Sequence, residues 1–202
     1  MTVEITKLDS PIDVMYLIHK ALRAEAARVE RICEQLAVGD SLQPFQEVFQ
    51  RWGKALAYHA HAEDHYMTAA LVDSPPARDN EATHRALEER LADIQTYAQD
   101  EVGSSLMSAK SQRHLFGKVV ALRIAQDDHF EEEEAFVLPL IRQRISEAQQ
   151  LEMARRLLVD VDEPDNGWIM DSVAEDLTPA ERQLLADLAA RFEAIPVEAR
   201  SR

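Results

Sequence analysis

Residues 126–140, QDDHFEEEEAFVLPL, place six carboxylates and one histidine directly against an apolar run. Within this stretch Gln126, His129, Glu133, Phe136 and Leu140 recur at steps of three and four, which is the spacing of one face of a helix. Upstream of the stretch the same register is apolar, so this is the face expected to enter the core. Most of the remaining acids fall on the solvated side. A histidine and a glutamate that face the core, spaced HxxxE, therefore need a partner.

Three earlier segments show the same helical spacing of apolar residues, at residues 12–36, 45–70 and 77–98. Ser10 and Pro11 supply an N-cap and a first-turn proline ahead of the first segment, and Gly39 follows its end. Ser74-Pro75-Pro76 separates the second segment from the third, which fades at Val102-Gly103. Four long amphipathic helices with short connections predict an all-α fold, an antiparallel up-down four-helix bundle with a C-terminal helical appendage.

The pattern weakens after the fourth segment. Pro139 is expected to kink or end the fourth helix near its last turn. The stretch from Ser146 to Val159 predicts another helix, and the acidic residues 159–167 predict a loop. Thr178-Pro179-Ala180-Glu181 is a capping box that opens a last helix through about Phe192.

These segments predict two parts, a four-helix bundle over residues 1–145 and a C-terminal helical extension over residues 146–202. Within the extension, Trp168, Ile169 and Met170 form a short apolar run. We expect this run either to dock over the bundle or to mediate dimerisation, so a homodimer stays open.

Composition excludes several classes of partner. The 202-residue chain has a formal net charge of -15, which disfavours nucleic acid and anionic membrane surfaces because both are bound through clustered Lys and Arg. The single cysteine, Cys33, excludes an internal disulfide framework. No apolar run reaches the length of a membrane span, and the first residues do not have the pattern of a signal peptide. The sequence predicts a soluble cytoplasmic protein.

The four core-facing stripes carry the chemistry. Each contains a histidine near mid-helix, and two contain a glutamate four residues after it, which gives the set His19, His59, Glu63, His84, His129 and Glu133. Residues at i and i+4 lie on one helix face, so each HxxxE pair directs two donor groups at one region. Buried carboxylates require a partner, and convergent imidazoles and carboxylates suit iron, manganese or zinc. The donors divide naturally between two ions, with both glutamates bridging.

The order His19, then His59-Ala60-His61-Ala62-Glu63, then His84, then His129-Phe130-Glu131-Glu132-Glu133 resembles the H-HxxxE-H-HxxxE arrangement of hemerythrin-like (HHE) cation-binding domains. The resemblance covers about residues 10 to 145. It implies a non-haem di-iron centre, with two iron ions in an oxo- or hydroxo-bridged Fe–O–Fe unit, and places iron ahead of manganese or zinc. It also implies an open position for a small oxidant ligand: hydrogen peroxide, dioxygen or nitric oxide.

Two positions depart from the oxygen-carrying hemerythrins. Those proteins have a second histidine four residues after the one on the third helix, where this chain has Glu88, and an aspartate five after the last histidine, where it has Glu134. Both acids are kept as additional candidate ligands. A more anionic site favours the ferric state and weakens the case for reversible oxygen carriage. The leading hypothesis is therefore reaction with hydrogen peroxide or dioxygen, by catalase-like or oxidase-type chemistry.

Other residues near the motifs have supporting or surface roles in this interpretation. Tyr16, Tyr58 and Tyr66 are candidates for a tyrosinate ligand or a supporting hydrogen bond at the edge of the centre. His61 and His65 are interpreted as a surface pair. Two alternatives to an enzyme stay open: a protein that binds or senses dioxygen, nitric oxide or iron, and a metal-free helical interaction module.

Overall fold

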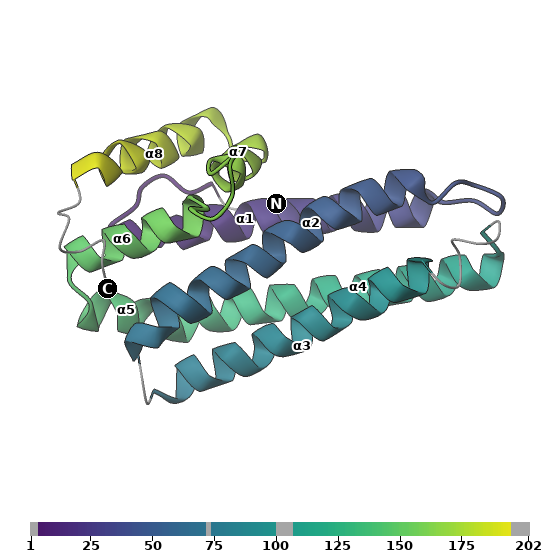
Figure 1. The fold of residues 1–202 in the computed structure, drawn as a ribbon, viewed down its shortest axis with the longest axis horizontal. Helices are drawn as coiled ribbons and strands as arrows, with labels where there is room; N and C mark the ends of the chain where they lie inside the picture. The colour runs from purple at the N-terminus through teal and green to yellow at the C-terminus, as the bar shows by residue number, and fades with distance from the viewer. Residues whose placement is uncertain (1–3, 72–73, 100–106, 195–202) are drawn as a thin grey trace.

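The protein is helical throughout the part that the computed structural model describes, residues 4–71, 74–99 and 107–194, where no strand occurs. This confirms the all-α prediction. The long helices are α1 (Val14–Gln35), α2 (Gln43–Ala62), α3 (Pro75–Tyr97) and α4 (Ala109–Glu132). They lie side by side along the longest axis of the molecule (Figure 1). The expected fading at Val102-Gly103 falls outside the described residues.

The start of the bundle follows the capping signal in the sequence. A 3-10 turn, η1 (Pro11–Asp13), leads into α1, and the hydroxyl of Ser10 donates to the Asp13 carboxylate over 2.8 Å. The backbone N–H of Ser10 donates to the same carboxylate over 2.9 Å. After α1 the chain turns through Gly39, whose φ of 92° lies in the left-handed region that a glycine adopts without steric cost.

A π-helical segment follows each HxxxE motif. After α2 the chain continues through η2 (Glu63–Met67) and a 3-10 turn, η3 (Thr68–Leu71). After α4 it continues through η5 (Glu133–Val137) into α5 (Leu138–Arg144). Such segments are rare and occur often at functional sites. Each begins at the glutamate of its motif.

The irregularity at the end of the fourth helix differs from the prediction made at Pro139. The regular α-helix ends at Glu132, ahead of the π-helical η5, and Pro139 lies in the first turn of α5. A proline is tolerated there because a first-turn residue has no intrahelical acceptor for its N–H. Helical backbone therefore continues past the proline to Arg144.

The remaining elements are α6 (Glu147–Leu158), α7 (Trp168–Glu175), α8 (Pro179–Ala190) and the 3-10 turn η6 (Phe192–Ala194). The capping box predicted at Thr178 opens α8, and Ser146 forms a second capping box, not predicted from the sequence, ahead of the predicted helix α6. The predicted last helix is interrupted, because α8 ends two residues before η6 begins. In Figure 1 the three helices lie together beside one end of α1.

The apolar run that includes Trp168 forms the start of α7, a helix that the sequence analysis did not predict. Ile169 is buried, and the indole N–H of Trp168 donates to the Asp160 carboxylate over 3.0 Å. The centre of the Trp168 ring lies 3.9 Å from the ammonium of Lys54, and the ring is edge-on to that of Tyr58; both partners are on α2. The run therefore docks onto the bundle. None of the described helices combines the length and apolarity that a membrane span requires.

Candidate metal centre

The six side chains singled out by the HxxxE pattern all lie in one buried region of the bundle. His19 comes from α1, His59 and Glu63 from the junction of α2 and η2, His84 from α3, and His129 and Glu133 from the junction of α4 and η5; all six are buried. Their donor atoms form two groups, one of His19, His59, Glu63 and Glu133 and one of Glu63, His84 and His129. Within each group the donor atoms lie within 4.8 Å of one another.

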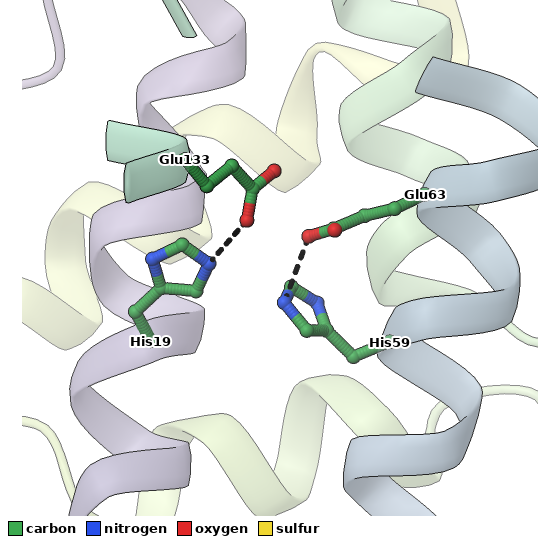
Figure 2. Close-up of side chains that lie close together, drawn as sticks. All are labelled: His19, His59, Glu63 and Glu133. Carbon is green, nitrogen blue, oxygen red and sulfur yellow. Dashed lines mark ion pairs between the residues drawn. The ribbon is translucent and has the colours of Figure 1, made fainter. Parts of the chain in front are cut away.

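The two glutamates lie against three of the four histidines. Figure 2 shows the carboxylates of Glu63 and Glu133 directed toward each other, with the rings of His19 and His59 beside them. The Nε2 atom of His19 lies 3.2 Å from Glu133 Oε2, and that of His59 lies 2.8 Å from Glu63 Oε1. The second oxygen of Glu63 lies 3.1 Å from His84 Nε2. Glu63 therefore contacts histidines of both donor groups.

Several of these atoms have no hydrogen-bond partner in the described part of the chain, although all are buried. They are Nε2 of His19 and of His59, Oε1 of Glu63 and both carboxylate oxygens of Glu133. Leaving one buried polar atom unpaired costs about 1–3 kcal/mol, and more when it is charged. Nitrogen and oxygen atoms that converge without partners are the donor set that a cation of the iron, manganese or zinc type satisfies. The residues present therefore fit a metal ion.

The ring nitrogens of His84 and His129 also indicate a site for a positive charge. Their Nε2 atoms lie only 2.9 Å apart, and their rings meet edge to face. Two unprotonated nitrogens at this distance repel each other, so a proton or a cation must lie against them. A metal ion accepts lone pairs from both rings at once.

The acid that follows each buried glutamate of the cluster orients a histidine. Nδ1 of His19 donates to Glu134 over 2.8 Å, and Nδ1 of His84 donates to Asp64 over 2.7 Å. Because an ionised carboxylate only accepts, the proton of each neutral ring resides on Nδ1 and leaves the Nε2 lone pair free. Such an outer hydrogen bond is typical of a metal-binding histidine.

The same two acids change the proton affinity of the rings. Burial lowers the pKa of His19, but the adjacent carboxylates of Glu133 and Glu134 outweigh it and raise the pKa to about 9. Burial likewise opposes the hydrogen bonds from His84 to Asp64 and Glu63, which raise its pKa to about 10. Without a metal ion, protons on His19 and His84 therefore balance the negative charge of the buried carboxylates. A bound cation would balance the same charge.

The two carboxylates of the cluster have opposite pKa shifts. Burial raises the pKa of Glu63, but the adjacent His59 and His84 outweigh it and hold the pKa well below its ordinary value. Burial and the charge of Glu63 raise the pKa of Glu133 to about 7. Burial and the neighbouring histidines lower the pKa of His129 to about 3. Two ionised carboxylates at this depth require positive charge beside them.

The other candidates lie outside the cluster. Glu134 accepts hydrogen bonds from Nδ1 of His19 and, over 3.0 Å, from Arg23. It therefore holds the His19 ring in place without entering the group of donor atoms. Glu88 is exposed in a surface groove beside Gly53 and Leu91, and the structure does not bring it to the cluster.

The three tyrosines also face elsewhere. The hydroxyl of Tyr58 donates to the backbone oxygen of Arg156, and that of Tyr16 accepts from Arg142. The ring of Tyr66 packs edge-on to His65, with the Arg156 guanidinium over it. The hydroxyl groups of Tyr58 and Tyr16 thus bond to residues outside the six buried side chains.

Two residues at the centre were missed by the sequence analysis. Asp64 could have been found, because each HxxxE motif is followed directly by a second acid, Glu63-Asp64 and Glu133-Glu134. Asn80 had no such signal: its amide lies 3.5 Å from Glu63 Oε2, four residues before His84. His61 and His65 are exposed and stack on each other outside the cluster, as expected of a surface pair.

The fold and the cluster together define a helical protein with a buried cation-binding site. The family model described as Hemerythrin HHE cation binding domain matches residues 10–141, and the chain belongs to this family. The match confirms the resemblance drawn from the motifs, and it spans the four long helices. Comparison with curated proteins and with solved structures gives no significant match.

Proposed function

We propose that this protein is a non-haem di-iron protein that reacts with hydrogen peroxide or dioxygen. The proposal rests mainly on the buried donor atoms of His19, His59, Glu63 and Glu133 that have no hydrogen-bond partner. In the proposed centre His19, His59 and Glu133 would hold one iron and His84 and His129 the other. Glu63, which belongs to both donor groups, would be shared between them. The five other candidates described above, Glu88, Glu134, Tyr16, Tyr58 and Tyr66, take no part as ligands.

We also infer the arrangement that positions these ligands. Residues 1–145 form an antiparallel up-down four-helix bundle, and residues 146–202 form a helical extension. The inference is supported by Figure 1, in which successive long helices run in alternating directions and α6, α7 and α8 gather beside α1. Each long helix then contributes one histidine at a matched depth.

An iron pair in this position supplies two-electron redox chemistry to a small oxidant. The chain itself contributes three things. Burial of the six side chains excludes bulk water from the donors. Glu134 and Asp64 fix the rings of His19 and His84 through their Nδ1 protons. Glu63 and Glu133 within the cluster, and Asp64 and Glu134 behind two of the rings, place negative charge at the centre. Negative charge stabilises the ferric state, so irreversible oxidative chemistry is favoured over oxygen carriage.

The test is to load the protein with iron under anaerobic conditions and to measure metal content, the near-ultraviolet absorption of the oxidised protein, and peroxide consumption. We expect about two iron ions per chain, as two donor groups imply. We expect His59→Ala to lose iron, whereas His61→Ala, which changes an exposed histidine on the same helix, keeps it. Iron-loaded protein that consumes neither peroxide nor dioxygen contradicts the enzyme proposal.

The second candidate is a binding or sensing protein for dioxygen, nitric oxide or iron. It is favoured by the ion pairs that attach α7 to the bundle, Arg28 to Asp176 over 2.6 Å and Arg51 to Glu175 over 3.0 Å. A sensor would transmit ligand binding at the centre through these contacts to the extension. Limited proteolysis with and without ligand separates the candidates, because cleavage that changes between α6 and α8 supports sensing and an identical pattern opposes it.

A further inference from the structure

A cleft of about 270 Å³ opens beside the cluster, between α3 and the end of α4. Two of the proposed ligands, His129 and Glu133, form part of its wall. Asp79, Asn80 and Thr83 of α3 and Glu132 of α4 also line it. The cleft therefore reaches the donors of the centre from the surface, on the side where His129 lies.

The two donor groups are unequal. The group around His19 and His59 has four residues, whereas the group around His84 and His129 has three. A metal ion that takes part in chemistry retains a coordination position that no protein atom fills. The cleft wall includes His129 of the smaller donor group, so the cleft gives access to the half of the centre that has the available position.

Asn80 lines the cleft and also contacts Glu63 of the cluster. It is buried on α3, one turn before His84, and its amide Nδ2 donates to Glu63 Oε2 over a long 3.5 Å. A contact at that distance is weak, and the amide carries a second N–H that can be donated elsewhere. Asn80 is thus a buried donor with spare capacity beside the open side of the centre.

The charge of the cleft restricts what enters it. Asp79 and Glu132 are exposed and line it together with Glu133, and none of the residues that line it is a lysine or an arginine. Negative side chains at a narrow approach raise the local concentration of cations and lower that of anions. This route therefore disfavours anionic ligands and admits uncharged ones.

We propose that small uncharged ligands, of the peroxide or nitric oxide type, reach the centre through this cleft and bind on its His84–His129 side, where the amide of Asn80 donates a hydrogen bond to them. This inference rests on the di-iron centre proposed above, and it specifies which half of that centre is reactive. Asn80 acts as a ligand-positioning residue, and Glu132 acts as a barrier to anions.

The first experiment tests the route with nitric oxide and the anaerobic, iron-loaded protein. Thr83→Trp places a bulky side chain in the cleft, and we expect the association rate constant to fall at least about tenfold at unchanged iron content. The matched control is Ser172→Trp, beside a second cavity of about 20 Å³ that borders His59. Its rate constant is expected to equal that of the unmodified protein. The proposal is overturned if Ser172→Trp lowers the association rate constant for nitric oxide and Thr83→Trp leaves it unchanged.

The second experiment tests Asn80 and the charge barrier by equilibrium binding. We expect Asn80→Leu to weaken nitric oxide binding about tenfold at equal iron content, since a hydrogen bond to a ligand that gains charge on the metal is lost. We expect Glu132→Gln to accelerate the binding of azide, an anion, to the oxidised protein and to leave the nitric oxide rate unchanged. Equal effects on both probes contradict the barrier.

Iron content separates failure of this inference from failure of the function. If the protein binds about two iron ions but Thr83→Trp and Asn80→Leu bind nitric oxide as the unmodified protein does, the di-iron centre stands and the cleft is not the route. If the protein holds no iron after anaerobic loading, both proposals fail. Circular dichroism of each variant confirms that a change in binding is not a loss of fold.

Discussion

At the level of single residues, the cluster repeats one arrangement twice. Each buried glutamate is followed by an acid that accepts a hydrogen bond from a histidine on another helix: Glu134 from His19, and Asp64 from His84. The buried glutamate faces the donor atoms, and its neighbour sets the tautomer of a ring. The orientation of these histidines thus depends on residues that do not enter the donor groups.

The first prediction concerns these two acids. We expect Glu134→Ala or Asp64→Ala to weaken iron binding about 10–100-fold, the usual effect of removing the outer partner of a metal-bound histidine. Iron affinity in competition with a chelator gives the measurement. Glu131→Ala is the control, because Glu131 belongs to the same acidic run and is exposed. If all three variants bind iron equally, the orienting role is wrong.

The six buried donors could be predicted from the sequence because their signal is local. A histidine and a glutamate spaced by four on an apolar stripe identify a helix face. Asn80 could not be predicted, because its role depends on the distance between α3 and Glu63, which no local pattern reports. For the same reason Glu88, one turn after His84 in sequence, gave no indication that it lies on the surface.

At the level of helices, the two π segments are the main departure from regular geometry. The N–H of Leu138 donates to the carbonyl of Glu133, and that of Thr68 donates to the carbonyl of Glu63, each spanning five residues where an α-helix spans four. Each segment therefore contains one more residue than an α-helical turn. Hydrophobic periodicity averages over long windows, so a single additional residue escapes a prediction from sequence.

The second prediction is that one residue can be removed from η5 without loss of the fold. Deleting the exposed Ala135 lets the N–H of Leu138 reach the carbonyl of Glu133 in an ordinary α-helical bond, so Leu138 and Ile141 stay in the core. We expect the free energy of unfolding to change by less than about 2 kcal/mol. Iron affinity should fall, because the backbone at Glu133 and Glu134 changes its twist. Urea unfolding and chelator competition measure the two effects.

The control is a deletion within regular α-helix. Removing Ala125 from α4 turns every later residue by about 100° around the helix axis, which moves His129 and Glu133 off the core face. We expect that variant to lose cooperative unfolding altogether. Similar losses for the two deletions would show that η5 has no spare residue.

At the level of the whole molecule, charged groups attach the extension to the bundle. Glu25, buried on α1, lies between Arg28 and Arg51, and each arginine also holds an acid at the end of α7. The caps of α6 and α8 were predictable because an N-cap motif is local. These ion pairs were not predictable, because their partners lie far apart in sequence. The fold within each helix was therefore easier to predict than the docking of the extension.

Glu181 is the most constrained of these attachments. It is fully buried, and its carboxylate accepts from the Lys20 ammonium over 2.6 and 2.8 Å. It also accepts from the backbone N–H groups of Ile5 and Thr178 over 2.9 and 3.0 Å. One side chain therefore holds together the N-terminal segment, α1 and the cap of α8. Burial opposes ionisation, but Lys20 and the two N–H groups lower the pKa of Glu181 to about 2.

The last prediction follows from the sign of that shift. A carboxylate whose pKa falls from 4.5 to about 2 on folding stabilises the native state fully above pH 4.5, and the contribution declines as pH drops toward 2. We expect Glu181→Gln to lower the free energy of unfolding by roughly 2–3 kcal/mol at pH 7, and the deficit to narrow between pH 4.5 and 2. Urea unfolding across this range measures it. Glu147→Gln, which removes an exposed ion pair with Arg191, should cost less than about 0.5 kcal/mol at any pH. A Glu181 deficit independent of pH would mean that the side chain acts through packing, because a lost charge interaction must disappear once the native carboxyl is protonated.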